Sequence, residues 1–402
     1  MIKWIYKIFG EVFSMIYSSF KEKKLSLLGF GTMRLPTAAN GEIDRKTFQQ
    51  MVDLSIKNGI NYFDTAWPYH SGLSETELGL ALSKYPRDSY YIATKYPGHQ
   101  ISSSYDPSAV FEKQLQKCGV DYFDFYLLHN VYENSLDVYL DEKWGIFEYF
   151  KEQKRLGRIK HLGFSTHATT ETMRRILEIM GEDMEFCQIQ LNWVDYTLQD
   201  GIGKIKLLNE RNIPIWVMEP VRGGKLCTLS KENETKLKAM RPDESIPAWG
   251  FRFLQDIPGV TMILSGMSNA GQMKDNLKTF EELIPLSEDE RKTLLEIAEE
   301  LKDSIPCTAC RYCTDTCPMG LDIPLLIANY NELRFVPSVN TSMRLDALPE
   351  SKLPSACIGC GACTQICPQR IDIPNVMKAF TEKLTTITKW SDVCAAREKA
   401  QK

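Results

Sequence analysis

The sequence of 402 residues lacks a hydrophobic run of the length that a membrane-spanning helix needs, which is roughly 20 residues. Near its N-terminus the longest uncharged stretch is residues 12–20, and Lys7 and Glu11 interrupt the apolar core that a signal peptide requires. The sequence therefore predicts neither a membrane-spanning helix nor secretion.

An excess of charge of either sign is also missing. The chain has 48 Lys and Arg against 52 Asp and Glu, a formal net charge of −4, without a prominent block of like charges. Nucleic acid is therefore not expected as a partner. The 43% hydrophobic and 25% charged content excludes a disordered chain. The length is suited to one large domain and one small domain.

The cysteines are not spread through the chain as they are in a secreted disulfide framework. Eight of the twelve lie in two groups near the C-terminus, and the other four are scattered. This distribution indicates metal binding in a reducing cytoplasm. The grouped residues are Cys307, Cys310, Cys313 and Cys317, followed by Cys357, Cys360, Cys363 and Cys367.

Each group has the pattern C-x2-C-x2-C-x3-C-P, and the second group repeats the first at an offset of 50 residues. An Asp-Ile-Pro segment follows each copy and predicts a helix there. This spacing is typical of [4Fe–4S] ligation, in which the fourth cysteine of each copy reaches the other cluster. Zinc would not need two overlapping quartets followed by proline. We expect two clusters, with local binding by each copy as the alternative to cross-ligation. The expected quartets are Cys307, Cys310, Cys313 and Cys367, and Cys357, Cys360, Cys363 and Cys317.

The segment before the cysteines alternates short apolar runs with amphipathic helical stretches. This alternation predicts an α/β fold, namely a closed (β/α)8 TIM barrel, followed by a small, mainly helical two-cluster module. A doubly wound open sheet is the alternative, but no G-x-G-x-x-G follows the first strand. The predicted strands are residues 26–33, 61–64, 90–95, 123–129, 161–165, 186–190, 215–218 and 261–265.

Residues 1–24 show one apolar stripe at helical spacing, which predicts an amphipathic helix. Packing on its own domain or a second subunit is favoured over peripheral membrane contact. A further helix over 287–301 opens with a capping box, formed by Ser287 and Glu290. The predicted division is the extension at 1–24, the barrel at 25–302, the ferredoxin-type module at 303–380 and a tail at 381–402.

Ionisable side chains follow successive predicted strands. Asp64 ends the second strand, with Tyr69 shortly after it, and Lys95 and His129 end the third and fourth strands. Each alone has an ordinary structural explanation, such as a capping aspartate or a core histidine. Catalytic groups of barrel enzymes lie at the carboxyl ends of strands, so four together predict an active site.

These residues, with the segments Gly-Phe-Gly-Thr-Met-Arg-Leu, Phe-Asp-Thr-Ala and Ala-Thr-Lys, resemble the aldo-keto reductase family. The cysteine motifs are similar to those of the family branch with a C-terminal ferredoxin-type domain. The resemblance implies that Tyr69 protonates the carbonyl oxygen, that Lys95 paired with Asp64 makes the phenol a better donor, and that His129 orients the carbonyl. Nicotinamide would supply the hydride.

The resemblance also implies the residues that contact NADP(H) or NAD(H). Glu219 stands where an aromatic residue usually stacks on nicotinamide, and Gln272 replaces an arginine, with Lys274 and Arg222 as substitutes for the 2′-phosphate. The family usually begins with a β-hairpin, whereas the predicted N-terminal helix would plug this barrel. The implied contacts are Ser165, Thr166, Gln188, Pro220, Gly266, Ser268, Gln272 and Asn276.

We therefore predict a cytoplasmic iron–sulfur oxidoreductase that uses NAD(P)H to reduce a small carbonyl compound, or oxidises an alcohol in reverse. One alternative is an electron-transfer protein with a redox partner. Another is a reductase whose substrate receives single electrons from the clusters. If the barrel served the electron-transfer protein only as a docking scaffold, it would not need both Tyr69 and Lys95. The presence of both residues therefore favours an enzyme.

Overall fold

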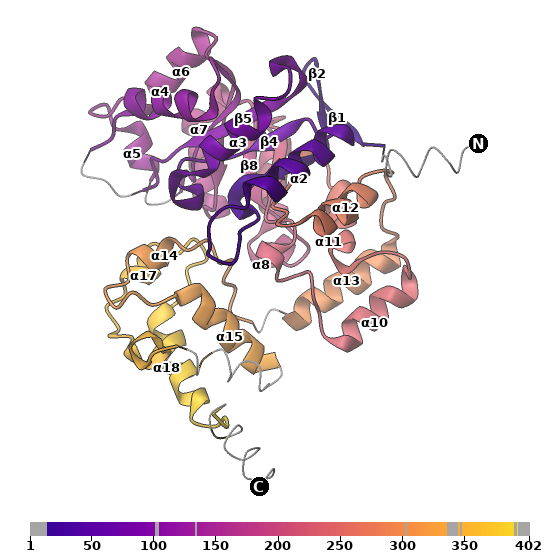
Figure 1. Ribbon diagram of the computed structural model, residues 1–402, viewed down its shortest axis with the longest axis vertical. Helices are drawn as coiled ribbons and strands as arrows, with labels where there is room; N and C mark the ends of the chain where they lie inside the picture. Colours follow the sequence, from indigo (N-terminus) through magenta and orange to yellow (C-terminus); the bar gives the residue numbers. More distant parts are fainter. Residues whose placement is uncertain are drawn as a thin grey trace. The chain divides into compact units, whose positions relative to one another are not determined.

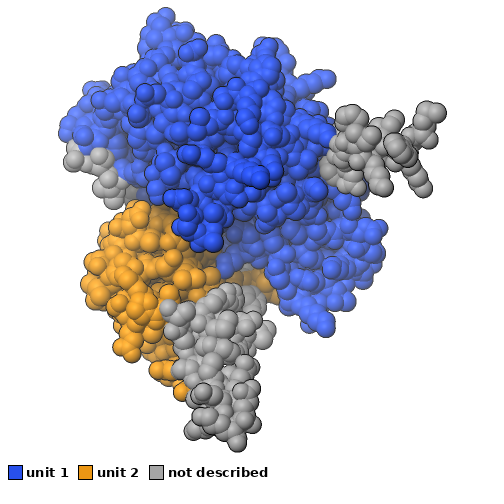
Figure 2. All heavy atoms as spheres, in the orientation of Figure 1, with its two compact units in different colours: residues 1–297 blue, residues 298–402 orange. Residues whose placement is uncertain are grey.

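A computed structural model of the protein describes residues 14–100, 104–132, 135–301, 304–335, 345, 348–389 and 392. The chain divides into two compact units, Met1–Ile297 and Ala298–Lys402, which Figure 2 colours blue and orange. Residues 302 and 303 lie outside the described part, so the boundary expected there stays a prediction.

The first unit contains a closed barrel of eight parallel strands in the order β10-β3-β4-β5-β6-β7-β8-β9. The predicted (β/α)8 fold is thus confirmed, and each predicted strand overlaps one strand of the barrel. The strands are β3 (Leu28–Gly31), β4 (Tyr62–Asp64), β5 (Tyr91–Tyr96), β6 (Phe123–Leu128), β7 (Ile159–Thr166), β8 (Cys187–Gln190), β9 (Ile215–Met218) and β10 (Val260–Ser265).

Helices connect the strands and surround the barrel (Figure 1). Several begin with a side chain that caps the first turn, as Asp44, Asp106 and Thr169 do. The helices are α2 (Arg45–Lys57), α3 (Ser74–Leu82), α4 (Pro107–Cys118), α5 (Leu136–Leu140), α6 (Ile146–Arg155), α7 (Thr170–Met180), α8 (Asp195–Leu198), α9 (Gly201–Asn209), α10 (Lys231–Met240), α11 (Ile246–Gln255), α12 (Ala270–Thr279) and α13 (Glu288–Leu301).

The helix predicted over residues 1–24 is wrong in its described part. Strands β1 (Tyr17–Phe20) and β2 (Lys23–Ser26) form an antiparallel hairpin, and residues 1–13 lie outside the described residues. The turn carries Lys21 at φ 50°. Apolar spacing alone could not reveal that Phe20 and Leu25 are buried against the barrel while Tyr17 is exposed. The expected departure from the family's N-terminal hairpin is therefore also wrong.

The hairpin inserts Phe20 among the side chains that fill the barrel. Its ring lies 5.5 Å from Phe125 and 5.1 Å from Trp216, measured between ring centroids. Side chains alternate along a strand, so every second residue faces this interior. Asp64 comes two residues after buried Tyr62, and Lys95 two residues after buried Ala93. The ionisable residues therefore continue the apolar interior toward the carboxyl ends of the strands.

The second unit is mainly helical, as the two motifs predict. Asp322 and Asp372 accept hydrogen bonds from Leu325 and Asn375, at 3.2 and 3.4 Å, which explains the repeated Asp-Ile-Pro as a helix start. Tyr330 and Phe380 pack against each other, 4.9 Å between centroids. The helices are α14 (Tyr312–Asp315), α15 (Ile323–Phe335), α17 (Ala362–Gln365) and α18 (Ile373–Leu384).

Helix α13 begins as its sequence predicts. The Glu290 carboxylate accepts a hydrogen bond from the backbone N–H of Ser287 at 2.8 Å, and the Ser287 hydroxyl accepts one from the N–H of Glu290 at 3.3 Å. This exchange is a capping box. Among the residues that the structure describes, no helix combines the length and apolarity needed to cross a membrane.

Candidate functional site

A buried ion pair lies at the carboxyl ends of β4 and β5. The Lys95 ammonium donates to Asp64 Oδ1 at 2.5 Å and to the backbone oxygen of Thr65 at 2.7 Å. The side chain of Lys95 is 0% exposed, and that of Asp64 is 4% exposed. Burial raises the pKa of Asp64 and lowers that of Lys95, while their mutual attraction opposes both shifts. Lys95 is therefore held rigidly, at a cost in desolvation.

Tyr69 and His129 lie beside this pair. Tyr69 begins a short 3₁₀ turn after β4, and the Lys95 nitrogen is 5.0 Å from the centroid of its ring. The His129 ring meets the Tyr69 ring edge-on, 6.0 Å between centroids. The Tyr139 hydroxyl donates to the backbone oxygen of His129 at 2.7 Å. All four predicted catalytic residues are thus brought together.

The electrostatic surroundings of Tyr69 differ from the expectation. Burial raises the pKa of its phenol well above the ordinary value, and the negative charges of Asp64 and Glu219 raise it further. The pKa of Tyr69 is therefore raised, not lowered. Tyr69 keeps its proton throughout the neutral range. It can still donate to an alkoxide, because an alkoxide is a much stronger base than a phenolate.

Two further histidines, His99 and His167, act electrostatically on His129, and no motif in the sequence indicated them. The rings of His99 and His129 lie 4.3 Å apart between centroids. Burial and the neighbouring His99 lower the pKa of His129 well below its ordinary value, and burial lowers that of His99 to about 3 and that of His167 to about 4. The three imidazoles are therefore neutral at neutral pH. Their only sequence signal is that each follows the end of a strand.

The residues expected to contact the nicotinamide amide lie on β7 and β8. The Ser165 hydroxyl accepts a hydrogen bond from the Asn130 N–H at 2.8 Å, while Thr166 donates to the backbone oxygen of Val131 at 2.6 Å. Gln188 is 2% exposed, and its Oε1 has no hydrogen-bond partner within the described part of the chain. A buried carbonyl oxygen without a donor fits a ligand amide N–H.

Glu219, where the family places an aromatic ring, follows β9 in a left-handed conformation at φ 56°. Its backbone oxygen accepts hydrogen bonds from the Asn192 amide at 3.1 Å and from the Arg222 N–H at 2.9 Å. Such a conformation is costly for a residue with a Cβ and is common at functional sites. Pro220, the next residue, is buried.

The segment expected to hold the adenosine phosphate leads into α12. The Ser268 N–H donates to Gln272 Oε1 at 2.7 Å, and the Asn276 amide donates to the Ser265 hydroxyl at 2.9 Å. A Cβ added at the exposed Gly266 would lie 3.5 Å from the side chain of Arg34, a neighbour that the sequence did not indicate. Arg222, suggested there as a phosphate partner, is 5% exposed and lies 3.3 Å from the carboxylate of Asp195, whereas Lys274 is exposed.

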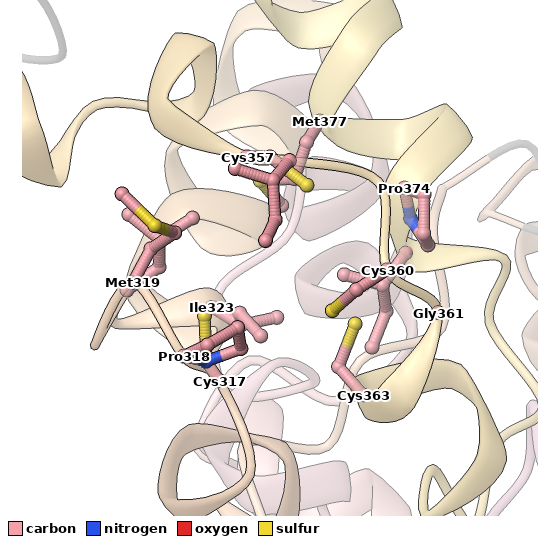
Figure 3. A pocket seen from close by; sticks show the side chains of 13 residues that line it. Cys317, Pro318, Met319, Ile323, Cys357, Cys360, Gly361, Cys363, Pro374 and Met377 are labelled. Carbon is pink, nitrogen blue, oxygen red and sulfur yellow. The ribbon is translucent and has the colours of Figure 1, made fainter.

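The cysteines of the second unit line two cavities. Each cavity has three cysteines from one motif and one cysteine from the other. One cavity is lined by Cys357, Cys360, Cys363 and Cys317. Their sulfur atoms lie around an open space in Figure 3, with Cys317 on the side opposite Cys360 and Cys363. The other is lined by Cys307, Cys310, Cys313 and Cys367. These are the two quartets expected for cross-ligation.

The donor sets are suited to clusters of iron and sulfur. Four thiolates around an otherwise apolar cavity match the ligands of a [4Fe–4S] cluster. Of the residues described by the structure, no three His, Cys, Asp or Glu side chains lie close enough to hold one metal ion.

Comparison with known families gives two matches. Residues 27–314 match the aldo/keto reductase family, and residues 306–371 match the 4Fe-4S dicluster domain. The first match includes the barrel with its ionisable residues, and the second includes both cysteine motifs.

The barrel is also similar to individual proteins. "Probable aldo-keto reductase 1" from Glycine max is 28% identical over 54% of this chain and 63% of its own length. "NADH-specific methylglyoxal reductase" from Escherichia coli is 24% identical over 69% of this chain and 96% of its own length. A solved aldo-keto reductase from Bacillus halodurans has a TM-score of 0.57 at 24% identity, over 71% of this chain and 96% of its own.

Proposed function

Because this chain belongs to the aldo/keto reductase family and carries a 4Fe-4S dicluster domain, we propose that it is an NAD(P)H-dependent carbonyl reductase with two [4Fe–4S] clusters. The observation that carries the proposal is the assembly of Tyr69, Lys95, Asp64 and His129 at the carboxyl end of the barrel. A small aldehyde or ketone is the proposed substrate, and alcohol oxidation is the reverse reaction.

The surroundings of Gln188 support nicotinamide binding. Its buried Oε1 would accept the amide N–H of the ring, and the nearby Ser165 hydroxyl would contact the same amide. When bound, nicotinamide supplies the hydride for the carbonyl carbon. The start of α12 would hold the adenosine phosphate, since the first N–H groups of a helix bind anions. Arg34 and Lys274 offer the positive charge that a 2′-phosphate would need.

Side chains of this protein hold and donate the proton that the carbonyl oxygen receives. Tyr69 holds it on the phenol, and His129, neutral at working pH, donates a hydrogen bond to the carbonyl oxygen and orients it. As the oxygen gains negative charge, it takes the Tyr69 proton. The phenolate left behind faces the Lys95 ammonium, which Asp64 holds in place. Burial strengthens this attraction, because little water screens it.

The two cysteine quartets would each hold one cluster. Cross-ligation ties the two motifs into one small module, in which each copy supplies the fourth ligand of the other cluster. Each cluster transfers one electron, whereas a hydride carries two. The hydride reaction therefore does not need the clusters, which leaves them a separate role in structure, regulation or electron entry.

The test is turnover by the anaerobically purified protein with its clusters intact. We expect the wild type to oxidise NADPH or NADH in the presence of aldehydes or ketones, and Tyr69→Phe to lose about 10²–10⁴-fold of that rate. Tyr91→Phe is the matched control, because Tyr91 lies in β5 outside the proposed site. Equal rates for Tyr69→Phe and the wild type would overturn the proposed acid. Absence of turnover with either nucleotide would favour the clusters as the electron source.

A further inference from the structure

Glu219 lies next to the residues proposed to bind nicotinamide. It follows β9 directly, and the residue before it, Met218, accepts a hydrogen bond on its sulfur from the Gln188 amide at 3.6 Å. Strand β9 pairs with β8, which carries Gln188, and Met218 is opposite Gln190 in this pairing. A carboxylate thus follows the strand beside the proposed amide contact, at a position where an aromatic ring was expected from the resemblance.

The backbone of Glu219 is fixed by buried neighbours. Its backbone oxygen accepts hydrogen bonds from the Asn192 amide and from the Arg222 N–H. Asn192 also donates to the Asp195 carboxylate at 2.6 Å, and the Arg222 guanidinium lies 3.3 Å from the same carboxylate, which compensates its charge. Asn192 and Asp195 are both 0% exposed. These contacts support the left-handed backbone of Glu219, which costs free energy for a residue with a Cβ.

The Glu219 carboxylate acts on the centre of the site. The side chain is half-buried, and its Oε2 atom is buried. The pKa of Tyr69 is raised by burial and then by the charges of Asp64 and Glu219, so the field of Glu219 reaches the phenol. Asp64 is paired with Lys95, and Glu219 contributes a further negative charge. Because little water screens a buried atom, this charge acts over a longer distance than it would at the surface.

We propose that Glu219 determines which oxidation state of the nucleotide is bound more tightly, because its carboxylate favours the oxidised, cationic nicotinamide over the reduced, neutral one. This inference rests on the proposed binding of NAD(P)H at this site. In the proposed reaction a hydride, with two electrons, passes to the carbonyl carbon, and the carbonyl oxygen takes the proton of Tyr69. The nicotinamide that has lost the hydride gains one positive charge. A negative charge beside it stabilises this product and so favours reduction of the carbonyl.

The difference between a carboxylate and an aromatic ring at position 219 explains why the substitution matters. An aromatic side chain packs on either oxidation state and attracts a cation only through its quadrupole. A carboxylate gives up this packing but carries a full negative charge, which discriminates between a neutral and a cationic ligand. The same attraction that assists hydride donation should also slow release of the oxidised nucleotide.

The test compares the dissociation constants of oxidised and reduced nucleotides. Anaerobic holoprotein without a carbonyl substrate is titrated with NADPH, NADP⁺, NADH and NAD⁺ in an isothermal titration calorimeter. Glu219→Gln removes the charge and keeps the size of the side chain, whereas Glu219→Asp keeps the charge. Glu232→Gln is the matched control, because Glu232 is an exposed carboxylate of α10. A change in packing alone should affect both oxidation states alike, so the ratio of their constants isolates the charge.

We expect Glu219→Gln to raise the ratio of the oxidised to the reduced dissociation constant about tenfold, equivalent to about 1.4 kcal/mol. Glu219→Asp and Glu232→Gln should keep the wild-type ratio within about twofold. An unchanged ratio in Glu219→Gln, or an equal rise in Glu219→Asp, would overturn the proposal. Urea unfolding of each variant verifies that it is folded. Wild-type protein that binds none of the four nucleotides would instead overturn the proposed function.

Discussion

Replacement of Lys95 by methionine separates the structural from the chemical role of the buried pair. Lys95→Met removes hydrogen bonds of 2.5 Å to Asp64 and 2.7 Å to Thr65, and it leaves the Asp64 carboxyl, 4% exposed, without its cation. Loss of one partner of a buried ion pair costs about 3–5 kcal/mol. We expect a decrease of this size in the free energy of unfolding, and a large loss of carbonyl turnover.

The assay is urea unfolding of the anaerobic holoprotein, followed by tryptophan fluorescence. The double variant Asp64→Asn with Lys95→Met should lose less stability than Lys95→Met alone, because no buried charge remains unpaired. Lys151→Met is the surface control: its 3.2 Å pair with Glu148 is largely solvated, and the change should stay within about 0.5 kcal/mol.

The effect of Lys95→Met should also depend on pH. Without the cation, the pKa of Asp64 rises further above its value in the unfolded chain. The folded state then binds more protons than the unfolded state, so its stability falls as the pH rises through the folded pKa. The deficit should be larger at pH 8 than at pH 5. A cost like that of Lys151→Met, or the same deficit at both pH values, would refute the reasoning.

Three further outcomes are expected. Phe20→Ala should lower the free energy of unfolding by about 3–5 kcal/mol in the urea assay, because it leaves a cavity among the aromatic side chains that fill the barrel. A loss below about 1 kcal/mol would contradict this packing. Burial lowers the pKa of His99 to about 3, so the free energy of unfolding should fall as the pH decreases below about 6.5. His99→Gln should remove about 1.4 kcal/mol per pH unit of that dependence. An unchanged dependence of the unfolding free energy on pH would contradict the lowered pKa. Cys310→Ala should reduce the cluster content, measured as iron and sulfide, and keep carbonyl turnover. Complete loss of turnover in a folded variant would favour single-electron chemistry.

Much of the fold could be predicted because its local signals agree with its tertiary structure. Strand β9 lies at the predicted residues, since a short apolar run between polar turns is buried on both faces of a parallel barrel. The spacing of the cysteines favours the two quartets that line the cavities, but it also permits each copy to bind a cluster by itself. Only the folded module places Cys317 and Cys367 each beside the other motif.

The parts that could not be predicted depend on contacts between distant segments. The apolar residues of the hairpin around Lys21 have a spacing that is compatible with both a helix and a strand pair. Only the barrel interior decides which of these side chains are buried. His99 lies in a loop, whose position relative to His129 does not follow from periodicity. The pKa of Tyr69 is raised first by burial and then by the negative charges of Asp64 and Glu219, and Glu219 lies far along the chain.

The central claim is that the barrel transfers a hydride and that Tyr69 supplies the proton. The most direct measurement uses NAD(P)H deuterated at the transferring C4 position, with product analysis by mass spectrometry under anaerobic conditions. We expect the deuterium on the former carbonyl carbon of the alcohol product, and a large loss of product in Tyr69→Phe. An alcohol without deuterium at that carbon, formed from electrons that pass singly through the clusters, would contradict the account.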